Sequence, residues 1–175
     1  MKYLGSSGMD NVRDVVLSAN GNTAYLADTS ILMIVDVSIP TAPRILGWYS
    51  GGSHMAIALN SDEEFAYSVG QDRGLTVIDV SNPVTPNLVG GSHEYSGYSQ
   101  SVTLSPDGTR VYVADVRSGL KIFDVSNPES PEELETHRVS GDAFDVVVSR
   151  GGNTAYVAAN NYGLQIINLS TSLSN

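Results

Sequence analysis

Two aspartates, Asp14 and Asp145, are the residues of this chain best placed to hold a metal ion. They occupy equivalent positions in a repeated sequence pattern, and closing the repeats into a ring would bring their carboxylates together. Asp28, Asp115 or Asn160 would add oxygen ligands of the kind that Ca²⁺ binds, but calcium takes six to eight of them. We therefore expect no cofactor, with a Ca²⁺ ion held by Asp14 and Asp145 as the alternative.

Acid–base catalysis has few candidate residues in this sequence. The three histidines are His54, His93 and His137, and we place His137 in an outer strand, away from any central channel. A general base would have to be His54 or an aspartate with a raised pKa, and no Ser-His-Asp or Glu-rich spacing accompanies them. We therefore assign no catalytic residue. A metal-assisted hydrolase or lyase remains an alternative to a binding protein.

One five-residue phrase occurs four times in the 175-residue chain. Its copies are Ile34 to Ser38, Val77 to Ser81, Ile122 to Ser126 and Ile166 to Ser170. Their central residues, Asp36, Asp79, Asp124 and Asn168, are separated by 43, 45 and 44 residues, a period typical of a repeat architecture. A residue that recurs in every repeat is better explained by a structural need of every repeat than by a single active site. We expect these aspartates to accept backbone hydrogen bonds in turns.

Each repeat has the pattern of an antiparallel sheet. Two short runs, joined by turn residues such as Asn20-Gly21 or Pro106-Asp107-Gly108, predict a hairpin in every copy. A third run leads into the repeated phrase, and a proline-containing turn follows because proline cannot donate to a sheet ladder. Outer strands are then predicted at residues 44–47, 87–90 and 133–135. Each repeat is therefore expected to be a blade of four antiparallel strands.

The fourth repeat lacks an outer strand, and a matching strand lies at the other end of the chain. Lys2 to Gly5 matches Arg44 to Gly47 in sequence and in its distance from the next strand. A closed ring needs such a displaced strand, whereas a solenoid does not. We therefore predict an all-β fold, a four-bladed β-propeller in one domain, whose N-terminal strand (residues 2–7) pairs with blade four. The predicted boundaries are 1–9 for the closing segment and 10–51, 52–96, 97–140 and 141–175 for the blades.

Closure of the ring can occur within one chain or between two. Only 7% of the residues are aromatic, and small residues dominate the strand faces, which favours the flatter stacking of many blades. Two chains would then exchange the closing strand and form a symmetric homodimer with an eight-bladed ring. A four-bladed monomer is the alternative, and the same strand match supports both.

Three segments carry a resemblance to a known family: Asp145 to Ser149, Asn153 to Ala158 and Gly119 to Pro128. They resemble the LVIVD repeat, a bacterial and archaeal propeller-blade motif named after its third strand, and nearly the whole chain follows the pattern. The resemblance implies a propeller, commonly on secreted or cell-surface proteins, and it implies no catalytic motif. An extracellular or cell-surface location is thus expected, although Met1 to Gly5 lacks the apolar core of a signal peptide.

The charge and composition exclude several classes of partner. Nineteen acidic and nine basic residues give a net charge of −10, which repels nucleic-acid phosphates and anionic lipid surfaces. No apolar run is long enough to span a bilayer, so membrane insertion is not expected. The absence of cysteine excludes disulfides, thiol catalysis and thiolate metal sites.

A binding site is best sought where the repeats differ. In a propeller, the starts of the innermost strands and the loops between second and third strands surround the channel mouth, and such loops often carry binding residues. The candidates at these places are Arg13, Asp14, His54, Tyr98, Gln100, Arg117, Asp145, Asn160 and Tyr162. We expect a non-enzymatic binding or scaffold protein whose channel-mouth face recognises a protein, a glycan or a small polar ligand. A calcium-binding propeller is the alternative.

Overall fold

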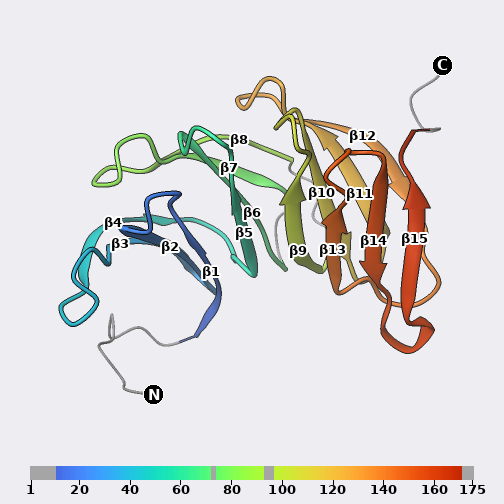
Figure 1. Ribbon diagram of the computed structural model, residues 1–175, viewed down its shortest axis with the longest axis horizontal. Coiled ribbons are helices and arrows are strands. Elements are labelled where there is room, and N and C mark those ends of the chain that lie inside the picture. The colour runs from blue at the N-terminus through green and yellow to red at the C-terminus, as the bar shows by residue number, and fades with distance from the viewer. Residues whose placement is uncertain (1–10, 72–73, 93–96, 171–175) are drawn as a thin grey trace.

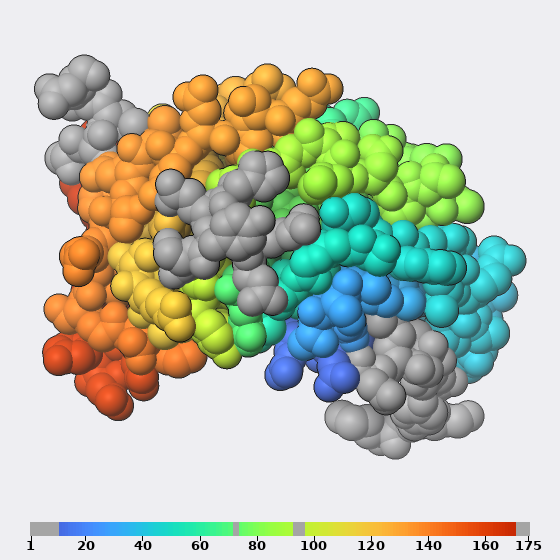
Figure 2. All heavy atoms as spheres, turned by 180° about the vertical axis from the view of Figure 1, so that it is seen from behind, coloured from blue at the N-terminus to red at the C-terminus, as the bar shows by residue number. Residues whose placement is uncertain are grey.

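Four antiparallel sheets follow one another along the chain in the computed structural model of this protein. The structure describes residues 11–71, 74–92 and 97–170. Figure 1 shows the sheets arranged as an arc, with the first and the fourth at opposite ends. The space-filling view in Figure 2 shows the same sheets as successive bands across the molecule.

Each sheet corresponds to one repeat, and its strands are ordered as they occur in the sequence. Blade 1 contains β1 (Val12–Leu17), β2 (Thr23–Asp28), β3 (Ile31–Asp36) and β4 (Arg44–Ser50), and blade 2 contains β5 (Ala56–Leu59), β6 (Phe65–Val69), β7 (Thr76–Asp79) and β8 (Asn87–Gly91). Blade 3 contains β9 (Ser99–Leu104), β10 (Arg110–Asp115), β11 (Gly119–Asp124) and β12 (Glu132–His137), and blade 4 contains β13 (Asp145–Val148), β14 (Thr154–Ala158) and β15 (Leu164–Asn168). A single 3₁₀ turn, η1 (Asn160–Tyr162), is the one helical segment among the described residues. Nothing in the described part of the chain is both helical and apolar over a length that would cross a membrane.

The hairpin prediction from the turn residues is confirmed in every blade. The first and second strands pair antiparallel in all four sheets. Gly21 and Gly108 have φ of 72° in two of these turns, a left-handed conformation that favours glycine. The period in the sequence therefore gives the strand order, and local turn chemistry gives the hairpins.

Blade 4 lacks an outer strand of its own among the described residues, as the sequence of the fourth repeat predicts. It has three described strands, and β15 pairs with β14 alone among the described residues. The predicted closing strand at residues 2–7 lies outside the described residues. The described sheets form an open arc, and closure of the ring remains a prediction.

Successive side chains of a strand point to opposite sides of the blade. An interior blade has a neighbouring blade on each side, so the side chains on both of its sides are buried. We call the side that carries the repeated tyrosine the front face and the opposite side the back face. Tyr25, Tyr67 and Tyr112 each pack with the back face of the next blade, and they are 4%, 2% and 1% exposed. Burial raises the pKa of Tyr25 and Tyr67. These tyrosines therefore fill the contacts between neighbouring blades.

The repeated aspartates lie at the ends of the third strands and hold the turns that follow. Asp36, Asp79 and Asp124 each accept a hydrogen bond on Oδ1 from the backbone N–H of the serine two residues later, at 3.0, 2.9 and 2.8 Å. Asn168 accepts the same bond from Ser170 N at 2.9 Å. Hydrogen bonds from Ser38 lower the pKa of Asp36, and the bonds from Ser126 do the same for Asp124. The structural role predicted for these residues is confirmed.

A glycine in the outer strands of blades 1 and 2 allows each of these blades to approach the proline turn of the next. A Cβ on Gly47 would lie 2.4 Å from the carbonyl oxygen of Pro83, and one on Gly90 would lie 2.2 Å from that of Pro128. Both distances are far below van der Waals contact. The glycines thus set the spacing of neighbouring blades at their outer edges.

Candidate functional site

The innermost strands β1, β5, β9 and β13 lie side by side along the inside of the arc (Figure 1), as expected for a propeller. The residue at the start of each strand differs between blades: Arg13, Met55, Gln100 and Phe144. Together with the loops between second and third strands, these residues make up what we call the channel-mouth face. The repeated elements form the scaffold, and this face carries the side chains that vary.

Two β-bulges lie at this face, in the pairing of the innermost strands β1 and β9, while further bulges lie where the outer strands β4, β8 and β12 pair. In β1 the pairing moves from Val12–Asp28 to Asp14–Ala27, which leaves Arg13 as the extra residue. In β9 it moves from Ser99–Asp115 to Ser101–Ala114, which leaves Gln100 as the extra residue. A bulge turns the extra side chain away from the regular alternation of the strand. Both bulges lie at the same repeat position and carry residues that sequence reasoning selected.

Arg13 and Gln100 differ in how accessible they are to a ligand. The Arg13 side chain is exposed, and the structure gives it no hydrogen bond or ion pair among the described residues. Nε2 of Gln100 is buried and has no hydrogen-bond partner there. A buried amide without a partner costs free energy, and an acceptor on a ligand would reach this nitrogen only after the side chain turns outward. Phe144, 44% exposed at the equivalent position of blade 4, adds an apolar surface.

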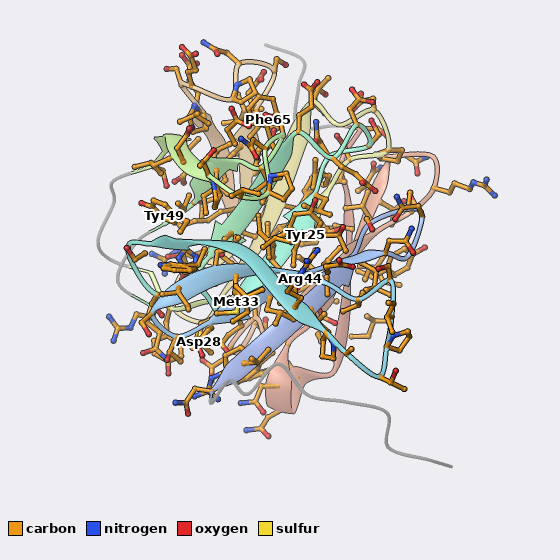
Figure 3. All side chains as sticks on the ribbon, turned by 90° about the vertical axis from the view of Figure 1, so that its left-hand side faces the viewer. Tyr25, Asp28, Met33, Arg44, Tyr49 and Phe65 are labelled. Carbon is orange, nitrogen blue, oxygen red and sulfur yellow. The ribbon has the colours of Figure 1, made fainter. Side chains whose placement is uncertain are left out.

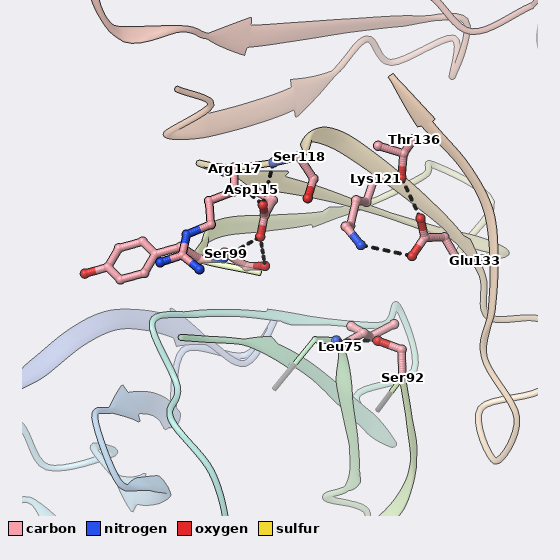
Figure 4. Close-up of polar contacts among 10 residues, drawn as sticks. Leu75, Ser92, Ser99, Asp115, Arg117, Ser118, Lys121, Glu133 and Thr136 are labelled. Atoms are coloured by element: carbon pink, nitrogen blue, oxygen red, sulfur yellow. Dashed lines mark hydrogen bonds and ion pairs between the residues drawn. The ribbon is translucent and has the colours of Figure 1, made fainter. Parts of the chain in front are cut away.

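A polar network joins blades 2 and 3 on the channel-mouth face. Gln71 Nε2 donates to the Tyr98 hydroxyl at 2.7 Å, and the backbone N–H of Tyr98 donates to Asp115 Oδ2, also at 2.7 Å. Figure 4 shows the same carboxylate accepting from Ser99 Oγ, at 3.0 Å. The structure thus places Tyr98 at this face but engages its hydroxyl in a contact between blades.

Asp115 is completely buried and organises the loop that carries Arg117. Its Oδ1 accepts from the backbone N–H groups of Arg117 at 3.0 Å and Ser118 at 2.8 Å (Figure 4). Both oxygens of the carboxylate therefore accept hydrogen bonds from the protein itself. The Arg117 side chain remains exposed, while Asp115 lines a small void between blades 2 and 3. Lys121 also lines that void, and its Nζ pairs with Glu133 Oε2 at 3.1 Å.

Asp14 and Asp145 lie in the first and fourth blades, and each joins its own blade to a neighbour. Asp14 Oδ2 accepts from the backbone N–H of Ile57 in blade 2 at 2.9 Å, and Asp145 Oδ1 accepts from Ser101 Oγ in blade 3 at 2.6 Å. Among the described residues no group of three or more His, Asp or Glu side chains gathers as a metal site. The open arc keeps these two aspartates apart, and calcium binding between them stays a prediction that depends on ring closure.

The histidines are used in packing where the structure describes them. His54 is 0% exposed, its Nδ1 lies 2.8 Å from Ser68 Oγ, and its ring meets Tyr49 edge-on. Its predicted place in the loop before β5 is correct, but no surface of the ring is open to a ligand. His137 lies in the outer strand β12, as predicted, and its Nε2 is 3.0 Å from Glu135 Oε1. His93 lies outside the described residues.

Asn160 and Tyr162 extend the channel-mouth face at blade 4. Both are exposed in η1, between β14 and β15, and Asn160 Nδ2 donates to Asp142 Oδ2 at 3.3 Å. Tyr162 is 66% exposed, and one edge of its ring lies against Gly141. These residues are positioned at the end of the arc, away from Arg13. The face therefore presents a basic residue in blade 1 and an amide with an aromatic ring in blade 4.

Sequence reasoning missed a hollow on the opposite side of the molecule. It lies where the hairpin turns of blades 2 and 3 meet, and its lining includes Asn60, Asp62, Glu64, Asp107 and Thr109. These are turn residues of the repeat, which predict hairpins and give no signal of a cavity. The hollow exists only because two neighbouring blades diverge at this edge.

Comparison with solved structures identifies the architecture. The chain superposes on Kuenenia stuttgartiensis hydrazine synthase and on a putative 6-phosphogluconolactonase from Bacteroides fragilis, each with a TM-score of 0.75 and 15% identity. The β-propeller domain of Myceliophteria thermophila Cps50 (Swd1) follows, with a TM-score of 0.74 and 15% identity. The matches cover 96%, 90% and 89% of this chain but 49%, 50% and 50% of those chains. The chain thus spans about half the length of these structures, and the likeness shows the propeller fold alone.

No curated protein matches the chain. The LVIVD repeat matches it four times, at residues 11–50, 51–92, 96–138 and 140–174. These four matches coincide with the four sheets and take in nearly all the described residues. The resemblance that the repeated phrase indicates is therefore confirmed over the whole array, and this protein belongs to the LVIVD-repeat family of β-propeller proteins.

Proposed function

We propose that this protein is a non-enzymatic binding or scaffold propeller that recognises a protein, a glycan or a small polar ligand on its channel-mouth face. The observation that carries the proposal is the pair of bulges that release Arg13 and Gln100 from the regular strand alternation. Bulges of this kind re-aim side chains next to functional sites. The repeated positions, by contrast, are occupied by turn and packing contacts.

The chemistry of the face fits a ligand with both polar and apolar parts. Arg13 and Arg117 supply exposed guanidinium groups, which suit carboxylate or other anionic oxygens. Gln100 offers an amide N–H, while Phe144 and Tyr162 offer aromatic surface that can stack on a sugar ring or an apolar side chain. Because the net charge is −10, such an anionic group must be held locally by these arginines against the overall field.

A library of labelled glycans and peptides, applied to the immobilised chain, tests the proposal. The strongest binder is then titrated against Arg13→Ala and Gln100→Ala, and each is expected to weaken binding by about tenfold, as is common for central contact residues. Arg150→Ala is the matched control, since Arg150 is exposed in the turn between β13 and β14 on the opposite side. Equal affinity of all three variants would place the ligand elsewhere, and a library without binders would contradict the proposal.

A further inference from the structure

The two ends of the arc carry apolar surfaces that the interior blades bury. On the front face of blade 4, the register places Val147, Tyr156 and Ile166 side by side, with Leu164 next to them. Leu164 and Ile166 are 63% and 64% exposed. Their counterparts in blade 3, Leu120 and Ile122, are 0% and 5% exposed because blade 4 covers them.

The back face of blade 1 shows the same contrast. Val15 and Leu17 are 54% and 55% exposed, whereas Ile57, the counterpart of Val15 in blade 2, is 3% exposed under blade 1, and Leu59, the counterpart of Leu17, is partly buried there. Figure 3 looks onto this end of the arc, where Met33 is labelled. Met33 belongs to a smaller buried cluster with Ala24, Leu26 and Val35 on the same face. The exposed part of the face therefore follows β1, the innermost strand.

These two surfaces correspond to the two sides of a contact between neighbouring blades. Within the chain, a front face packs on the back face of the following blade at three interfaces. Among the sheets that the structure describes, the front face of blade 4 has no following blade, and the back face of blade 1 has no preceding blade and is open along β1. We propose that a second copy of this chain covers both surfaces, so that blade 4 of each copy packs on blade 1 of the other and an eight-bladed ring is closed.

The curvature of the arc supports a second copy of the chain as the partner. The chain superposes on about half of propeller chains with a TM-score of 0.75, so its blades are already set at angles that suit a larger ring. A contact between unlike surfaces makes either a ring or an open filament, and two half-rings related by a two-fold axis close after one step. The edge of β15 that faces away from β14 would then lie beside the second copy. That residues 2–7 supply the strand there remains the sequence prediction.

Sedimentation equilibrium of the 175-residue chain tests the proposal. A mass twice the 18.5 kDa of the chain is expected. A monomer would overturn the proposal and indicate that other repeats cover the two faces, and species larger than a dimer would overturn the closed ring. Leu17→Glu and Ile166→Lys should each weaken the dimer by about tenfold or more, since each buries a charge in an apolar contact.

Mixing the two variants tests whether blade 4 of one copy contacts blade 1 of the other, or whether the same blade of each copy meets in the dimer. In the mixed dimer one interface is unmodified, and the other sets the introduced carboxylate against the introduced ammonium group, so dimers should return. Val84→Lys is the matched control, because Val84 is 62% exposed in a turn away from both ends and should leave the dimer intact. If Leu17→Glu remains fully dimeric, or if the mixture stays monomeric while circular dichroism shows folded sheets, the proposal is wrong.

Discussion

Ser101 Oγ donates a hydrogen bond to Asp145 Oδ1 at 2.6 Å and joins the innermost strands of blades 3 and 4. The two residues occupy the same repeat position, so the contact shows how closely that position approaches its equivalent in the next blade. In the proposed ring, Asp145 is followed by Asp14 of the second copy. Two carboxylates would then face each other where blades 3 and 4 have a hydroxyl and a carboxylate, and their repulsion would weaken the dimer.

Asp145→Asn is therefore expected to tighten the dimer at low ionic strength. The amide oxygen can still accept from Ser101, and the amide N–H can donate to the carboxylate that faces it. The difference from wild type should shrink as salt is added, because salt screens the repulsion of exposed charges. Sedimentation at several salt concentrations measures it. Asp62→Asn, an exposed change in a turn of blade 2, is the control for the loss of one negative charge.

The repeated aspartates should matter as hydrogen-bond acceptors, with little dependence on their charge. Asp79 Oδ1 accepts from Ser81 N at 2.9 Å and from Ser81 Oγ at 2.6 Å, while Asn168 makes the equivalent backbone contact without a charge. Asp79→Ala is expected to lower the free energy of unfolding by about 1–2 kcal/mol, and Asp79→Asn by well under half of that. Urea denaturation measures both. Equal losses would show that the negative charge itself stabilises the turn.

Much of the fold can be predicted from the sequence because the signals are local and repeated. The hairpin predicted in every repeat forms in every blade, since alternating side chains and turn residues act within one hairpin. The outer strand of blade 3 is predicted at 133–135 but runs as Glu132–His137. Its charged residues lack the apolar pattern of β4 and β8, and pairing with β11 extends the strand beyond what its own sequence indicates.

The candidate site is less completely predictable, because exposure at the channel mouth depends on the neighbouring blade. Arg13, Arg117 and Tyr162 are exposed as a binding role requires. His54 has an equally suitable position in its own repeat, yet it is buried between Tyr49 and Ser68. Its sequence neighbours carry no signal for this packing. The bulges at Arg13 and Gln100 are also absent from the sequence prediction, since a bulge depends on the register between two strands.

The contribution of Asp107 to the stability of the protein should be constant near neutral pH and should be lost in acid. Hydrogen bonds from Ser105 Oγ at 2.5 Å and from Thr109 lower the pKa of Asp107 from its ordinary value of 3.8 to about 2. Because the folded-state pKa is depressed, this stabilisation is fully present above the ordinary value and is lost as the pH falls toward about 2.

Comparison with Asp107→Asn isolates this contribution, since all other carboxylates titrate in both proteins. The wild type is expected to be the more stable protein at neutral pH, and its advantage should decline between pH 3.8 and about 2. Chemical denaturation at a series of pH values measures the difference. An advantage that does not change across this range would show that the pKa of Asp107 is not depressed in the folded protein.

The close approach of blades 2 and 3 at their outer edges should make glycine necessary at position 90. Gly151, which lies in a hairpin turn, should tolerate a side chain. A Cβ on Gly90 would lie 2.2 Å from Pro128 O and 2.9 Å from the carbonyl carbon of Glu129, both backbone atoms that cannot move aside without shifting the turn of blade 3. Gly90→Ala should therefore lower the free energy of unfolding by about 1–3 kcal/mol, the usual range for overpacking. A Cβ on Gly151 would have no neighbour closer than 3.6 Å, and its φ is not positive, so Gly151→Ala should change stability by about 0.5 kcal/mol or less. Thermal unfolding of the two variants compares them directly, and equal stability would show that blades 2 and 3 are not in contact at this edge.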